Sequence, residues 1–133
     1  MLFGQEHVER YVATDGEEGH DWQGTSVLIL TTTGRRSGEQ RSTPLIYGKH
    51  GEDHLVVASK GGAEEHPAWY LNLDASSEVA VQVRGDRFTA HARTATREAK
   101  RTLWPIMVER WSAYDEYQAK TDRDIPVVVL ERR

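Results

Sequence analysis

Two short segments of the sequence combine fixed positive charge with glycine, a pattern typical of sites that bind small anions. One is Lys60 followed by Gly61 and Gly62, and the other is an arginine-rich segment at 34–41. Glycine permits positive φ, and successive amides in such turns attract anions. Arginine adds a bidentate donor and lysine a point charge. Because the chain is acidic overall, with a net charge of -4, we expect these residues to hold a small anionic molecule. The basic candidates are Arg35, Arg36, Arg41 and Lys60.

The patterns that mark several other kinds of catalytic site are absent. There is no cysteine, which excludes thiolate catalysis and cysteine-ligated metals. The six histidines are scattered over different elements of the chain, so we expect no metal site. Neither a serine nucleophile elbow, nor a P-loop, nor a Rossmann glycine fingerprint occurs.

Aromatic residues form a second group of candidates near the end of the chain. Tyr114 and Tyr117 lie three residues apart among polar neighbours, so they can line a pocket for a flat ring. Trp69 and Trp104 are interpreted as core residues.

The length of 133 residues predicts a single domain, residues 1–133. The net negative charge argues against nucleic acid as a partner. No apolar run is long enough to span a bilayer, and no signal peptide is visible, so we expect a cytoplasmic protein.

The elements that must position these residues alternate between helices and short strands. Val27 to Leu30 is a continuous apolar run that indicates a buried strand, and Val79, Val81 and Val83 show the period-2 pattern of a half-buried one. Strands are also expected at 43–47, 55–59, 88–92 and 127–130, with a hairpin turn at 50–53. The segment 34–40 is interpreted as a loop.

Helices are predicted around 8–12, from Pro67 to 73, and from 97 onwards with Thr96 as the N-cap. Pro105 predicts a break or kink near Leu103 and Trp104, followed by a helical piece that carries Trp111, Tyr114 and Tyr117. Strands that are neighbours in sequence favour antiparallel pairing. We therefore expect an α+β domain with a small barrel rather than a doubly wound sheet.

Several motifs of the chain, in the same order, resemble those of the deazaflavin-dependent nitroreductase family over nearly its whole length. The matching motifs are Leu30–Gly38, Arg41–Leu45, Ala58–Ala63, His66–Leu73, Tyr114–Gln118 and Thr121–Val128. The resemblance implies a split β-barrel like that of the FMN-binding proteins, with mostly antiparallel strands and flanking helices. It also implies an oxidoreductase that transfers hydride from reduced coenzyme F-420, an 8-hydroxy-5-deazaflavin, to a quinone, a nitro compound or an activated double bond.

The same resemblance assigns roles to individual residues. Phosphate and oligoglutamate contacts are implied for the four basic candidates, and contacts along the deazaflavin or its phosphate for Pro44, Leu45, Ile46, Ser59, Gly61, Gly62 and Ala63. Trp111, Tyr114 and Tyr117 are implied on the substrate side, with the two tyrosines as catalytic hydrogen-bond donors. A non-catalytic carrier of coenzyme F-420, or of FMN, is the alternative. The oligomeric state (monomer or homodimer) and a peripheral membrane contact stay open.

Overall fold

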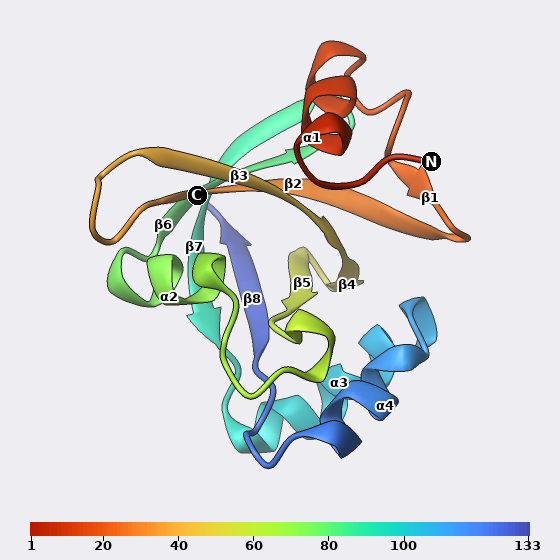
Figure 1. The fold of residues 1–133 in the computed structure, drawn as a ribbon, viewed down its shortest axis with the longest axis vertical. Coiled ribbons are helices and arrows are strands. Elements are labelled where there is room, and N and C mark those ends of the chain that lie inside the picture. Colours follow the sequence, from red (N-terminus) through yellow and green to blue (C-terminus); the bar gives the residue numbers. More distant parts are fainter.

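The computed structural model describes all 133 residues as a curled antiparallel sheet of eight strands with four α-helices around it (Figure 1). The strand order is β1-β2-β6-β7-β8-β5-β4, and β3 also pairs with β2. The elements are α1 (Gly4–Ala13), β1 (Asp21–Trp22), β2 (Thr25–Thr33), β3 (Gln40–Ile46), β4 (Gly48–His50), β5 (Asp53–Val57), the 3-10 turn η1 (Lys60–Gly62), α2 (Ala68–Ala75), β6 (Glu78–Val83), β7 (Asp86–Thr94), α3 (Arg97–Arg110), α4 (Ala113–Lys120) and β8 (Val127–Arg132).

Strand β2 is buried on both faces, which explains its continuous apolar run. Leu28 and Leu30 point into the core enclosed by the curled sheet. Val27 and Ile29, on the opposite face, pack with Tyr11 of α1. Strand β8 repeats this arrangement: its even-numbered residues join the enclosed core, and its odd-numbered residues pack under α3 and α4. The prediction of a buried strand at 27–30 and that of a strand at 127–130 are both confirmed.

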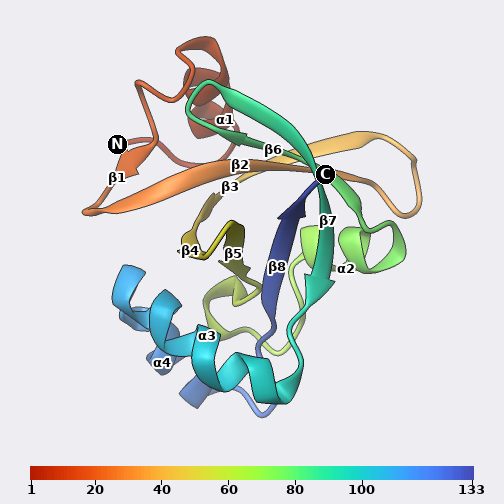
Figure 2. The ribbon, with the colours of Figure 1, turned by 180° about the vertical axis from the view of Figure 1, so that it is seen from behind.

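The helices cover different parts of the sheet. Figures 1 and 2 show α1 over one side, α3 and α4 together at the far end, and α2 beside the enclosed core. The predicted cap of α3 is confirmed, since the Thr96 hydroxyl accepts a hydrogen bond from the Ala99 amide at 3.1 Å. Pro67 precedes α2 with an extended backbone, as expected. None of the helices has both the length and the hydropathy required to cross a bilayer.

The predicted break near Leu103 and Trp104 is wrong, because α3 continues through Pro105 to Arg110. Pro105 lies on the exposed side of the helix, where water can bond the carbonyl that loses its proline partner. The helix ends instead at Trp111, which therefore lies between α3 and α4 rather than within the second helix.

Two strand predictions need correction. The hairpin around Gly51 joins β4 to β5, whereas the residues at 43–46 belong to β3 and pair with β2. The loop predicted at 34–40 is also one residue shorter, because Gln40 pairs with Thr33 and Arg41 with Thr32 in the β2–β3 ladder. Arg41 is consequently held on a strand, while Arg35 and Arg36 lie on the connecting loop.

A buried histidine on β5 makes stability depend on pH. His54 is 8% exposed, and its Nδ1 atom is buried without a hydrogen-bond partner. Burial, and then the charges of Lys49 and Arg132, lower the pKa of His54 below its ordinary value. The unfolded chain therefore binds the proton more tightly than the folded one. The stability is complete above about pH 6.5, the ordinary histidine value, and is lost as the pH falls below it.

We expect the free energy of unfolding to fall between pH 7 and pH 5, by up to about 1.4 kcal/mol per pH unit from this one group. Urea titrations at several pH values measure it. His54→Gln should flatten the slope, and His50→Gln, at an exposed position of β4, should not. An equal slope in the His54 variant would contradict the assignment.

Candidate functional site

The turn after β5 has a left-handed backbone and places the Lys60 side chain next to two glycines. Lys60, Gly61 and Gly62 have φ of 46°, 64° and 84°. The amides of Gly62 and Ala63 close the turn on the Ser59 and Lys60 carbonyls, at 2.9 and 3.1 Å. Their N–H groups are therefore engaged within the turn itself.

Gly62 lies against the backbone of α4. A Cβ atom there would stand 2.7 Å from the Tyr117 carbonyl oxygen, whereas a Cβ atom at Gly61 would meet nothing within 4 Å. Gly62→Ala should therefore destabilise the protein by more than Gly61→Ala, which shares the positive φ but not the clash. Thermal melting of the two variants measures the difference, and equal melting temperatures would show that α4 moves aside without cost.

Arg123, on the α4–β8 connection, stabilises this turn through hydrogen bonds to its backbone. Its guanidinium donates hydrogen bonds to the carbonyls of Ala63, Ala58 and Ser59, at 2.8, 3.2 and 2.7 Å. It also contacts Nδ1 of His66 at 3.1 Å, so this nitrogen accepts the bond. Burial, followed by the charge of Arg123, lowers the pKa of His66. These contacts hold the turn in one position relative to α4.

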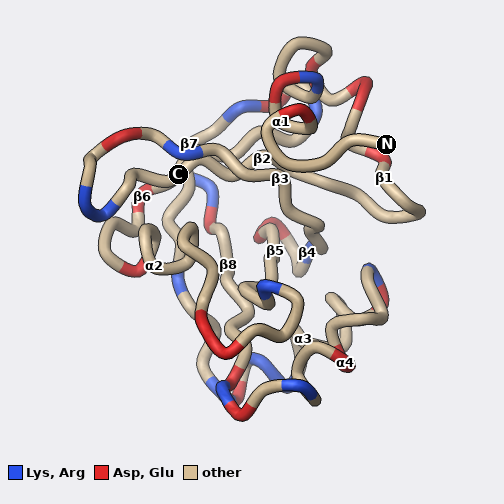
Figure 3. The backbone as a smooth tube through the Cα atoms, in the orientation of Figure 1, with Lys and Arg blue, Asp and Glu red and all other residues tan.

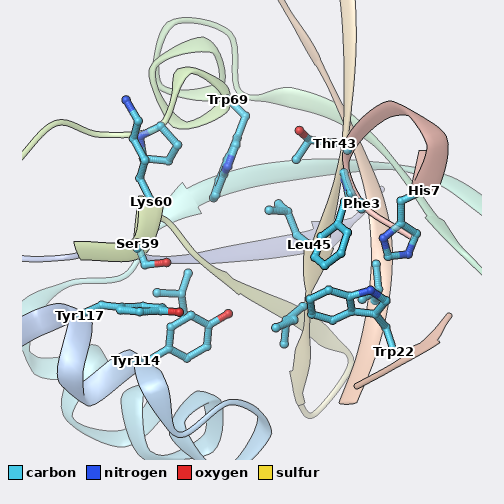
Figure 4. A pocket seen from close by; sticks show the side chains of 17 residues that line it. Phe3, His7, Trp22, Thr43, Leu45, Ser59, Lys60, Trp69, Tyr114 and Tyr117 are labelled. Carbon is cyan, nitrogen blue, oxygen red and sulfur yellow. The ribbon is translucent and has the colours of Figure 1, made fainter. Parts of the chain in front are cut away.

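A cavity of about 450 Å³ lies between this turn, strand β3 and helix α4 (Figure 4). Its surface is mainly apolar and aromatic, and Lys60 is the only lysine, arginine, aspartate or glutamate among its lining residues. The lining residues are Phe3, Gly4, His7, Trp22, Val27, Thr43, Pro44, Leu45, Ile46, Val57, Ser59, Lys60, Gly61, Pro67, Trp69, Tyr114 and Tyr117. We call this space the ring cavity.

Tyr114 and Tyr117 project from α4 on one side of the ring cavity (Figure 4). Their rings meet edge to face, with centroids 6.1 Å apart. Tyr114 is only 5% exposed, and its hydroxyl has no hydrogen-bond partner within the protein. Burial, with a smaller effect of Tyr117, raises the pKa of Tyr114. Its hydroxyl therefore keeps its proton and can donate a hydrogen bond to a molecule in the cavity.

Trp111 supports this side of the cavity rather than lining it. Its indole N–H points to the Tyr117 hydroxyl at 3.5 Å, a long contact. Its ring packs against Trp22, with centroids 5.8 Å apart. Trp22 in turn donates to the Leu2 carbonyl at 2.9 Å. The N-terminal segment is thereby fixed at the mouth of the ring cavity.

A second cavity of about 520 Å³ lies between the β2–β3 loop, α1 and α2, and we call it the basic cavity. Figure 3 shows basic residues gathered on this loop at one edge of the molecule. Arg35 donates to the buried Asn72 side chain at 3.3 Å, and Arg41 pairs with Glu39 at 3.1 Å. The residues that line the basic cavity are Gln5, Gly34, Arg35, Arg36, Ser37, Arg41, Ser42, Thr43, Ala68, Trp69 and Asn72.

The two cavities adjoin, since Thr43 and Trp69 line both. One end is apolar and flanked by aromatic rings, whereas the other carries three arginines. The amides at the start of α2 add positive potential at the junction, because Ala68 and Trp69 line the basic cavity. A ligand that joins a flat ring system to an anionic chain fits this donor set, and coenzyme F-420 is such a molecule.

The structure brings most of the predicted site residues together. Pro44, Leu45, Ile46, Ser59, Lys60, Gly61, Tyr114 and Tyr117 line the ring cavity, and Arg35, Arg36 and Arg41 line the basic one. Gly62, Ala63 and Trp111 lie outside both linings. No group of three or more His, Asp or Glu side chains is placed to hold a metal ion.

Sequence reasoning missed the contributions of Phe3, His7 and Trp22 to the ring cavity, and that of Arg123 behind it. The aromatic character of Phe3 and Trp22 was visible in the sequence. Nothing local indicated that α1 and β1 would face α4 across the cavity.

Comparisons with known proteins identify the family of the chain. The family model described as F420H(2)-dependent quinone reductase matches residues 3–132. An F420H(2)-dependent quinone reductase of Mycobacterium tuberculosis is 40% identical over 131 residues, which cover 96% of this chain and 88% of the relative.

Two solved structures are also similar. A structure described as an F420-H2 dependent reductase (FDR-A) has a TM-score of 0.74 at 40% identity, covering 79% of this chain and 93% of that one. A chain described as a domain-swapped dimer has a TM-score of 0.77 at 37% identity, covering 96% of each. The expected split-barrel fold is confirmed. The chain belongs to the F420H(2)-dependent quinone reductase family and is an oxidoreductase with coenzyme F-420 as its hydride donor.

Proposed function

We propose that the protein reduces a small quinone in the ring cavity, with the arginines of the basic cavity holding the anionic chain of the cofactor. The observation that carries this proposal is the junction at Thr43 and Trp69, where an aromatic-flanked cavity opens into a basic one. Reduced coenzyme F-420 supplies a hydride when it is bound. The remaining work of the site is binding, orientation and stabilisation of charge.

The cofactor side is assigned to β3 and to the turn after β5. Pro44, Leu45 and Ile46 form an apolar wall along which a flat ring can lie. Lys60, 49% exposed at its side chain, has only a distant partner in Glu65 at 3.9 Å. Its ammonium is thus available to a phosphate. Gly62, Ala63 and Arg123 contribute indirectly, by holding the shape of the turn.

The acceptor side is assigned to α4. When hydride reaches a quinone, negative charge develops on its oxygen, and a donor already aimed at that position lowers the barrier. The unpartnered hydroxyl of Tyr114 is such a donor. Tyr117, whose ring lies across that of Tyr114, is assigned the orientation of the acceptor ring. Trp111 lies beside Tyr117, with its indole N–H 3.5 Å from the Tyr117 hydroxyl.

The test is to mix the protein with reduced coenzyme F-420 and menadione and to follow the return of the oxidised cofactor's absorbance. We expect turnover with coenzyme F-420, and none with FMN or NADPH in its place. Tight binding of coenzyme F-420 without turnover of any quinone, nitro compound or enone would refute the proposed reaction.

A further inference from the structure

His7 faces the ring cavity and has no part in the function proposed above. It lies in α1, is 3% exposed, and belongs to the cavity lining. Figure 4 shows its imidazole with Trp22 and Thr43, on the side of the cavity opposite Tyr114 and Tyr117. A buried imidazole that borders a reaction cavity is suited to proton transfer, because histidine exchanges its proton near neutral pH.

The two ring nitrogens of His7 have different surroundings. Nε2 lies 2.9 Å from the Gly19 carbonyl oxygen, and since a carbonyl only accepts, Nε2 carries the hydrogen. Gly19 approaches so closely that a Cβ atom there would stand 2.9 Å from the His7 ring. Nδ1 has no hydrogen-bond partner in the protein, and it is not one of the fully buried atoms left without one. Nδ1 therefore keeps some accessible surface, in a side chain that lines the ring cavity.

We propose that His7 donates the proton that completes reduction of the acceptor, a role that rests on the function proposed above. When the bound cofactor supplies hydride, its C–H bond breaks, the hydrogen forms a new bond to the acceptor, and the displaced π electrons become negative charge on an acceptor oxygen. The Nδ1–H bond of the protonated imidazole then breaks, and its proton forms the new O–H bond. The ring is left neutral, with Nε2–H on the Gly19 carbonyl, and water restores the proton.

The other titratable side chains in the lining are less suited to this step. Burial raises the pKa of Tyr114, so its hydroxyl can donate a hydrogen bond to the charged oxygen but does not transfer its proton to it. Tyr117 receives its contact from Trp111, and Lys60 is assigned to the cofactor.

His7→Gln is the sharpest test, since the glutamine amide can still donate to the Gly19 carbonyl but cannot transfer a proton. We expect an unchanged melting temperature and cofactor affinity, with kcat lower by about 10²- to 10⁴-fold. The dependence of kcat on pH should differ between the wild-type protein and the variant. The loss should be larger with an enone acceptor than with menadione, whose reduced anion is a weaker base.

A second measurement does not depend on the variant or on turnover. The ¹⁵N shifts of the His7 ring in the cofactor-free protein should report Nε2–H and a bare Nδ1 at high pH, and menadione should perturb Nδ1. A proton on Nδ1 at high pH, or wild-type kcat and pH dependence in His7→Gln, would overturn the inference. If the wild-type protein fails to reduce menadione at all, the proposed function itself is refuted, and this role with it.

Discussion

Replacing Tyr114 by phenylalanine is expected to lower kcat by about 10²- to 10³-fold, the effect of losing one preorganised donor to a developing oxyanion. The substitution removes a hydroxyl that has no hydrogen bond within the protein, so no internal partner is left unsatisfied. The buried ring and its edge-to-face contact with Tyr117 stay in place. Melting temperature and affinity for coenzyme F-420 should therefore change little. Steady-state kinetics with menadione measures the effect.

Tyr117→Phe is the matched comparison. Its hydroxyl receives only the long contact from Trp111, at 3.5 Å, and its ring is expected to orient the acceptor. A rise in KM with kcat nearly unchanged is the expected result. If both variants reduce menadione as fast as the wild type with unaltered KM, the two tyrosines are packing residues and the acceptor lies elsewhere.

The parts of the fold that could be predicted from sequence are those whose signal is local. The runs at 27–30 and 127–130 are apolar at every position because α1, α3 and α4 cover the outer face of β2 and β8. Thr96 was recognised because a cap depends on the next three residues. The break predicted at Pro105 is wrong for a non-local reason. Proline is unfavourable inside a helix, but α3 tolerates it because Pro105 lies on the exposed side of that helix.

The residues of the candidate site also differ in whether a local sequence signal marks them. Arg35, Arg36 and Lys60 could be found because glycines stand beside them in the sequence. His7 and Arg123 could not, because their partners are distant: 12 residues separate His7 from Gly19, and 64 separate Arg123 from Ser59. The substrate-side role of Trp111 is implied only by the family resemblance and stays a prediction. The residue follows the end of α3, and its indole N–H lies 3.5 Å from the Tyr117 hydroxyl.

Lys60→Ala is expected to weaken binding of coenzyme F-420 by roughly 10- to 150-fold, since a hydrogen bond to a charged group contributes about 1.5–3 kcal/mol. The melting temperature should stay the same, because the ammonium is half exposed and its nearest carboxylate, that of Glu65, is 3.9 Å away. Fluorescence titration of the cofactor measures the affinity. The difference between wild type and variant should shrink in high salt, which screens exposed charges.

Lys49→Ala provides the control for the loss of one positive charge. Lys49 is exposed on β4 and lines a separate depression with Tyr47 and Arg110, away from both cavities. Glu65→Gln should leave the affinity unchanged or raise it slightly, because it removes the only carboxylate that competes for Lys60. Equal affinity of Lys60→Ala and the wild type would show that Lys60 is a solvated charge. The phosphate would then have to be held by the arginines of the basic cavity alone.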